Sequence, residues 1–266
     1  KAMDEVIPPS ETGVKMSIFK QLKLSFKNRP FVIVCILFLI QGFAHYGVNA
    51  INVYWFKYVL GDQNPLATFT LITLIPSMLG AFTSQFWAGK FRDKGKTIGF
   101  TYLIQLVLFT LQFIIFRNSV NLVLLYGLGI IVQYAMGANM ALIYGMVPDT
   151  IEYSEYITKG ERMDGFLNTI SSFWNKIGIT IGTAGTSFVL GLTGYAPNVA
   201  EQAPSVILAL DIMKWIMPAA FALIALILLR WYNLDHDTFD KLVAKLNEER
   251  PKWEAERALK KQQEGN

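Results

Sequence analysis

Six long apolar stretches, separated by short polar connectors, make up most of the chain. A membrane-spanning helix needs about 20 mainly apolar residues, and each stretch is of about that length. The six stretches are Phe31–Leu60, Ala67–Phe91, Ile98–Phe116, Asn121–Val147, Met163–Leu192 and Ser205–Tyr232. The pattern therefore predicts an all-α membrane protein with six transmembrane helices in residues 31–232.

Lys and Arg residues are concentrated on one side of these predicted spans. All but four of the 24 lie in or beside the N-terminal 30 residues, the second connector, the fourth connector or the C-terminal tail. The four exceptions are Lys57, Arg117, Lys176 and Lys214. Because cytoplasmic loops carry an excess of Lys and Arg, we expect a multi-pass protein of the inner or plasma membrane with both termini in the cytoplasm.

The composition agrees with a membrane protein and excludes several other classes. Hydrophobic residues account for 53% of the chain, and the mean hydropathy is +0.35, which is too apolar for a soluble domain of this size. The net charge of +4 is explained by the loop positions, so the lipid bilayer is the expected partner and nucleic acid is not. A single Cys35 rules out a disulfide framework, and two widely separated histidines, His45 and His236, predict no metal site.

The two flanks differ from the middle of the chain. Within residues 1–30, Ile18, Phe19, Leu22 and Phe26 recur at helical spacing among lysines, which is typical of an amphipathic helix on the inner leaflet. Residues 233–266 are rich in Lys and Glu and predict a solvated cytoplasmic helix. No site is expected in that tail.

Lys176 is the most informative residue, because it lies about midway along Met163–Leu192. A charge at that depth costs several kcal/mol unless it faces a polar cavity or a partner. The acid deepest in an apolar stretch, Asp211, lies near the outer end of the last span, beside Lys214. An acidic partner is therefore expected from a second half of the protein or from a second subunit. The alternative is that the Lys176 stem snorkels to an interface.

Polar and aromatic residues surround Lys176 in the same stretch. Ser172 lies one helical turn earlier, and Trp174 and Asn175 are immediate neighbours. Hydroxyl and amide groups beside an aromatic plane are suited to a sugar, although polar residues in membrane helices also join neighbouring helices. In the first span, Gln41, His45, Tyr46, Asn49 and Asn52 form a second polar stripe, which either lines a cavity or makes buried helix contacts.

The fourth connector is acidic as well as basic. Asp149 and Glu152 stand at the predicted end of one span, and Arg162 and Asp164 open the next. Ion pairs among them would make and break as a cytoplasmic mouth opens. The sequence contains neither a Walker loop nor a dinucleotide-binding glycine motif, and no nucleophile and base at useful spacing, so we do not expect an enzyme.

Five local segments carry a family resemblance: NRPF at 28–31, YWFKYVLG at 54–61, PDTIEYSEY at 148–156, RMDG at 162–165 and SFWNKIG at 172–178. These segments resemble the C-terminal half of the glycoside-pentoside-hexuronide:cation symporters, the group of the major facilitator superfamily that includes melibiose and lactose carriers. The resemblance covers almost the whole chain, to about Arg250.

The resemblance implies two six-helix halves related by an axis along the membrane normal, with substrate bound near the midplane between them. Lys176 matches the family's functional lysine, and Ser172 and Asn175 match positions that face the sugar. Met140 falls where melibiose carriers have a tryptophan that contacts sugar, so this chain departs from them there. The family's cation-binding aspartates belong to the N-terminal half, and residues 1–30 match the central cytoplasmic loop, which implies a fragment.

The resulting hypothesis is one half of a secondary transporter that carries a sugar or glycoside with Na+ or H+ and has no other cofactor. The predicted substrate-facing residues are Asn49, Met140, Ser172, Trp174, Asn175 and Lys176. The predicted cytoplasmic gate comprises Asp149, Glu152, Arg162 and Asp164. The alternative is a self-associating six-helix membrane protein with a structural or regulatory role and no transport of its own.

Overall fold

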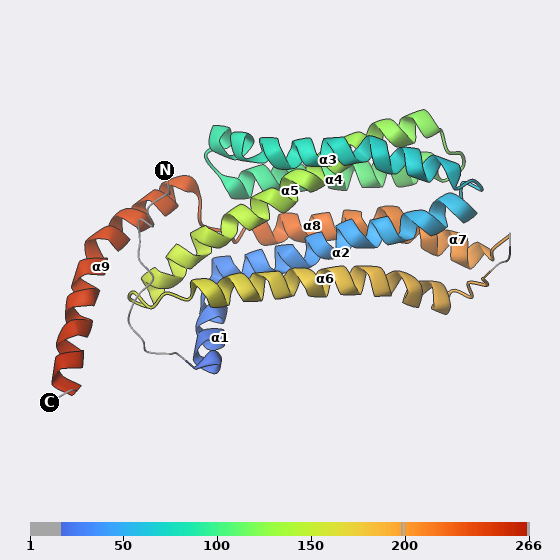
Figure 1. Ribbon diagram of the computed structural model, residues 1–266. Helices are drawn as coiled ribbons and strands as arrows, with labels where there is room; N and C mark the ends of the chain where they lie inside the picture. The colour runs from blue at the N-terminus through green and yellow to red at the C-terminus, as the bar shows by residue number, and fades with distance from the viewer. Residues whose placement is uncertain (1–16, 198, 200, 265–266) are drawn as a thin grey trace.

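The computed structural model describes residues 17–197, 199 and 201–264, and this part of the chain is helical throughout, without strands (Figure 1). In chain order the helices are α1 (Ile18–Lys27), α2 (Arg29–Tyr58), α3 (Asn64–Phe91), α4 (Lys94–Phe116), α5 (Leu122–Ile157), α6 (Asp164–Leu192), α7 (Pro204–Asp211), the π-helical turn η1 (Ile212–Ile216), α8 (Met217–Leu229) and α9 (His236–Glu264). The first 16 residues, expected to belong to a central loop, lie outside the described residues.

Within the described residues, five helical segments are long and apolar enough to cross a membrane. They are α2, α3, α4, α5 and the continuous segment Pro204–Leu229 formed by α7, η1 and α8. The sixth predicted span, α6, does not reach this hydropathy, although its 29 residues would extend about 43 Å at 1.5 Å per residue. The multi-pass architecture is therefore established, and the membrane-spanning role of α6 remains a prediction.

Glycines allow two pairs of helices to pack closely. On α6, Gly178 and Gly182 face the backbone of α2 at Leu39, Phe43 and Gly47. On α2, a Cβ added to Gly42 would lie 2.8 Å from the carbonyl oxygen of Asn175. In the α3–α5 pair, Gly80 and Gly137 lie directly against the partner backbone. Small residues of this kind let membrane helices approach closely enough for dispersion and weak polar contacts to hold them together.

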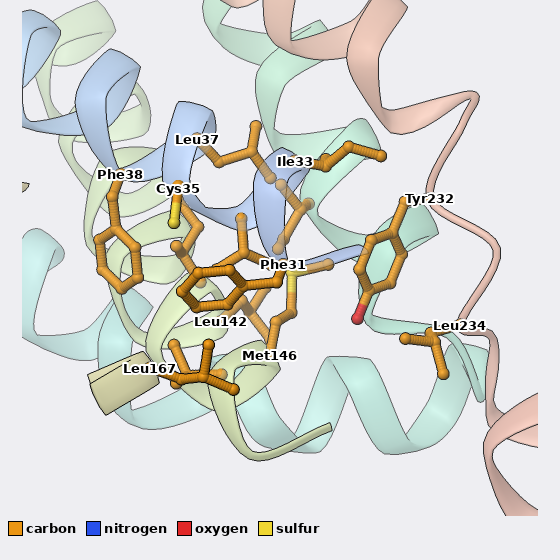
Figure 2. Packing of buried hydrophobic residues seen from close by; sticks show 14 of the residues in the cluster. Phe31, Ile33, Cys35, Leu37, Phe38, Leu142, Met146, Leu167, Tyr232 and Leu234 are labelled. Carbon is orange, nitrogen blue, oxygen red and sulfur yellow. The ribbon is translucent and has the colours of Figure 1, made fainter. Parts of the chain in front are cut away.

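Aromatic and aliphatic side chains from α2, α5 and the segment after α8 form a core at one end of the bundle. Figure 2 shows Phe31, Leu37 and Phe38 of α2 near Leu142 and Met146 of α5, and all five are buried. Tyr232 and Leu234 extend the same core toward the start of α9. Figure 1 shows α1 and α9 at this end, together with the α3–α4 and α5–α6 connections. Because these segments carry most of the Lys and Arg residues, we call it the basic end of the bundle.

Helix α5 ends at Ile157, ten residues after Val147, where the fourth span was predicted to end. Pro148 lies inside the helix, where a proline removes one backbone hydrogen bond and usually ends or kinks a helix. Here Lys94 of α4 donates to the carbonyl oxygen of Gly145 at 2.8 Å and to Asp149 at 2.7 Å. Asp149, Glu152 and Glu155 consequently lie on a helix and not in a loop.

Candidate functional site

One exposed flank of α6 carries a row of polar side chains. Ser172, Lys176, Thr180, Thr183 and Ser187 are all exposed, and at 100° per residue they fall within a sector of about 80°. The glycine face that packs on α2 lies to one side of this sector, and the exposed Phe173, Ile181 and Phe188 lie to the other. This amphipathic arrangement explains why α6 is less apolar than the other long helices.

Lys176 has neither an ion pair nor a side-chain hydrogen bond within the described part of the chain. The deepest acid, Asp211, instead accepts a hydrogen bond of 2.8 Å from Trp55 Nε1. An isolated ammonium flanked by hydroxyl groups is able to attract an anion or an acidic side chain. The assignment of Lys176 as a functional residue stays a prediction.

The residues next to Lys176 do not share its surroundings. Asn175 is buried against α2, and its amide nitrogen has no hydrogen-bond partner among the described residues. Trp174 is half-buried and packs on the core of the basic end. The structure therefore brings Ser172 and Lys176 together on the exposed flank and places Asn175 and Trp174 elsewhere on the helix.

A cavity of about 380 Å³ with a mainly apolar lining lies between α2, α3 and α5. Its lining includes Met140, the predicted substrate contact, together with Gln41, His45, Tyr46 and Ser77. Gln41 donates to the carbonyl oxygen of Met136 at 3.0 Å, while its own side-chain oxygen has no partner in the described chain. Cavity lining and helix contact therefore both occur along the predicted polar stripe of the first span.

The remaining members of that stripe separate. Asn49 is exposed on α2 and does not line the cavity. Asn52 is buried, and its side-chain oxygen accepts a hydrogen bond from Lys214. Three helical turns are enough to place residues of one stripe in three environments, because α2 contacts different neighbours along its length.

Lys214 is a fully buried lysine to which the sequence pattern assigned no role. Its side chain is enclosed by the rings of Trp55, Phe56, Phe69 and Trp215, with the ammonium 4.2 Å from the ring centroid of Trp55. Aromatic faces attract a cation, most strongly when both are removed from water. The residue lies in the π-helical turn η1, and turns of this kind often mark functional or strained positions.

At the basic end, five charged side chains form one connected group, which we call the Glu155 cluster: Glu152, Glu155, Arg162, Asp164 and Arg250. Arg162 contacts Glu155 at 3.3 Å and Asp164 at 3.1 Å, and its contact with Glu152 is longer, at 3.8 Å. Arg250 of α9 contacts Glu152 at 2.5 Å and Glu155 at 2.8 Å. The hydrogen bonds that Arg250 donates to Glu155, together with the charges of both glutamates, raise the pKa of Arg250 above its ordinary value.

The cluster differs from the predicted gate in two respects. Asp149 does not join it, because Lys94 of α4 pairs with Asp149 at 2.7 Å. Arg250 does join it, although the tail was expected to be solvated and without a site. The sequence held no signal for Arg250, since its neighbours are equally charged and only the return of α9 toward α5 distinguishes it.

Replacing Arg250 with Gln is expected to lower the melting temperature and to loosen α9, at a cost of about 2 kcal/mol for the lost charged hydrogen bonds. The side chain of Glu155 is only 4% exposed, so it would keep Arg162 as its single basic partner. Thermal unfolding and limited proteolysis of α9 would measure the change. Lys252→Gln is the matched control, because Lys252 is exposed and its one ion pair among the described residues is with Glu249. Equal behaviour of the two variants would contradict the role given to Arg250.

A multi-pass helical bundle with an unpaired basic residue on a polar flank of one helix and a cavity between three others has features of a membrane transporter. Residues 7–236 match the family described as "MFS/sugar transport protein". The chain belongs to this family, within the glycoside-pentoside-hexuronide:cation symporter group of the major facilitator superfamily.

Curated relatives support this assignment, and their names describe transport proteins. A "Glucuronide carrier protein homolog" of Escherichia coli (strain K12) is 30% identical over 228 residues, which are 83% of this chain and 48% of the relative. An "Isoprimeverose transporter" of Lactiplantibacillus pentosus is 30% identical over 233 residues, 87% of this chain and 47% of the relative. The "Putative glycoside/cation symporter YagG" of E. coli (strain K12) is 25% identical over 219 residues, 82% of this chain and 46% of the relative.

The chain thus spans about half the length of the curated relatives it matches. These relatives are named as carriers, transporters and symporters rather than as enzymes.

Proposed function

We propose that this chain supplies the six-helix half of a secondary transporter that moves a sugar or glycoside together with Na+ or H+ by alternating access. The observation that carries the proposal is the exposed polar flank of α6, where Lys176 lies among hydroxyl groups without an acidic partner in the described chain. In a two-half transporter this flank faces the substrate pathway, and the remaining half or a second subunit supplies the acid.

Each predicted substrate residue has a role within this proposal. Lys176 responds to the charge of the cation and substrate, and Ser172 binds a sugar hydroxyl. Met140, in the α2–α3–α5 cavity, contacts an apolar face of the substrate. Asn175, whose buried amide nitrogen lacks a partner, reaches the pathway when α6 moves relative to α2, whereas Trp174 supports the helix from the core side.

The Glu155 cluster is the proposed inner gate. The basic end then faces the cytoplasm of the cell membrane, which the distribution of Lys and Arg supports. Ion pairs that span α5, α6 and α9 hold these helices together in one state and must rearrange in another. Because these pairs are partly exposed, individual pairs contribute modestly and the network acts as a unit.

Counterflow of labelled sugars in vesicles that contain the complete protein tests the proposal. Lys176→Ala is expected to lower the rate about tenfold or more, the effect of removing a charged hydrogen bond. Lys57→Ala is the matched control, because Lys57 is an exposed lysine near the end of α2 outside the polar flank. Unchanged counterflow by the Lys176 variant would refute its role.

The substrates in this assay should include a glucuronide and a neutral glycoside, since the named relatives handle a glucuronide in one case and isoprimeverose in another. A Lys176 effect confined to the glucuronide would assign the lysine to the substrate carboxylate. Imposed Na+ and proton gradients, applied separately, would identify the coupling cation. Absence of any uptake by the complete protein would instead favour the structural or regulatory alternative.

A further inference from the structure

One cavity at the basic end lies outside the proposed transport path. It is an open groove of about 570 Å³ between the start of α2, the end of α8 and the start of α9, with Phe26 of α1 at its edge. This volume is within the range of about 300–1,000 Å³ that is typical of ligand sites. We call it the α2–α8 groove.

The walls of the groove are mainly apolar. Val32, Ile33 and Ile36 come from α2, Leu228 comes from α8, and Leu234 follows α8. Figure 2 shows Ile33 and Leu234 at the edge of the core, on the side where Tyr232 lies. An elongated apolar group can therefore lie in the groove against the outer surface of the core.

The rim of the groove is basic and aromatic. Arg29 is exposed and lacks an acidic partner in the described chain, and it is the one charged side chain in the lining. Phe26 and Trp231 are 62% and 61% exposed, as aromatic residues at a membrane boundary commonly are. The exposed Lys23 and Lys27 of α1 add positive charge on the same side.

Within the described chain no carboxylate forms an ion pair with Arg29, and no acidic residue lines the groove. Asp235, which follows the lining residue Leu234, instead accepts a hydrogen bond of 2.9 Å from the backbone N–H of Thr238. Arg29 therefore remains available to an anion that comes from outside the chain.

From these features we propose that the α2–α8 groove binds one anionic phospholipid, with an acyl chain along Val32, Ile33 and Ile36 and the phosphate on Arg29. An apolar wall beneath an unpaired cation matches the amphiphilic structure of a phospholipid, and basic pockets between helices at membrane boundaries take such head groups. A free phosphate would use the cation and leave the apolar wall empty.

The direct test is native mass spectrometry of the complete protein in neutral detergent, titrated separately with phosphatidylglycerol and phosphatidylcholine of identical acyl chains. Phosphatidylglycerol is expected to bind about fivefold more tightly, the preference that one basic residue near the surface confers. Glycerol phosphate, which carries the charge without the chains, is expected to bind far more weakly than phosphatidylglycerol.

Two variants separate the contributions of charge and groove. Arg29→Gln should abolish the preference for the anionic lipid, whereas Val32→Trp should fill the groove and weaken both lipids. Arg117→Gln is the control, because Arg117 is exposed at the opposite end of the bundle. Thermal unfolding would show whether the Val32→Trp variant still folds. If it does not fold, the lipid preference of the Arg29→Gln variant tests the proposal by itself.

Equal binding of the two lipids by the unaltered protein would overturn the proposal, as would equal lipid preference in Arg29→Gln and Arg117→Gln. Binding of glycerol phosphate as tight as that of phosphatidylglycerol would indicate a simple phosphate site and would also overturn it. None of these readouts depends on transport, so the result is independent of the proposed function.

Discussion

Lys214→Ala is expected to destabilise the bundle by about 3 kcal/mol or more. The substitution leaves a cavity between the rings of Trp55, Phe56, Phe69 and Trp215. It also removes the donor that satisfies the buried side-chain oxygen of Asn52. Thermal unfolding of the purified protein in detergent would measure the loss as a lower melting temperature.

Lys214→Met distinguishes the packing contribution from the charge. Methionine fills most of the same space without a charge, so partial recovery of stability would assign the difference between the two variants to packing. Lys57→Ala is the matched control, since Lys57 is exposed and contacts a single ring, that of Tyr58. If the alanine variants of Lys214 and Lys57 melted at the same temperature, the aromatic enclosure would have no structural importance.

Gly137→Ala is the second change for which a large effect is expected. A Cβ at this position would overlap the backbone carbonyl of Ser77 on α3, and backbone cannot move aside as a side chain can. The α3–α5 pair would have to separate, at a cost of about 3 kcal/mol, the upper part of the range for overpacked sites. We expect a lower melting temperature and reduced yield of folded protein.

Gly127→Ala on the same helix provides the comparison. An added Cβ there meets nothing within 4 Å, so the variant should be neutral or slightly more stable, because alanine favours a helix more than glycine does. Equal destabilisation by both substitutions would show that the contact with Ser77 on α3 does not determine the outcome.

Hydropathy was sufficient to predict much of the fold, because a bilayer requires long apolar helices whatever their neighbours are. Five of the six predicted stretches correspond to helices that could cross a membrane. The family could also be recognised from local segments such as residues 172–178. The end of α5 could not be predicted, because a proline usually ends or kinks a helix and α5 continues through Pro148 to Ile157.

The candidate site was predictable only where one helix carries it. Ser172 and Lys176 share a flank because they are four residues apart, whereas the Glu155 cluster needs α9 to return to α5 and α6. The same limit applies to Asp149, whose partner Lys94 lies 55 residues away in the sequence.

The two lysines in apolar stretches show where the sequence ceased to be informative. By itself it determined that Lys176 and Lys214 lie in hydrophobic segments and that a charge there needs a partner. Only the tertiary structure decided that Lys214 is enclosed by aromatic rings and Asn52, while Lys176 is exposed on the polar flank of α6. The physical reason is that burial depends on which face of a helix its neighbours cover, and that is a property of the packed bundle.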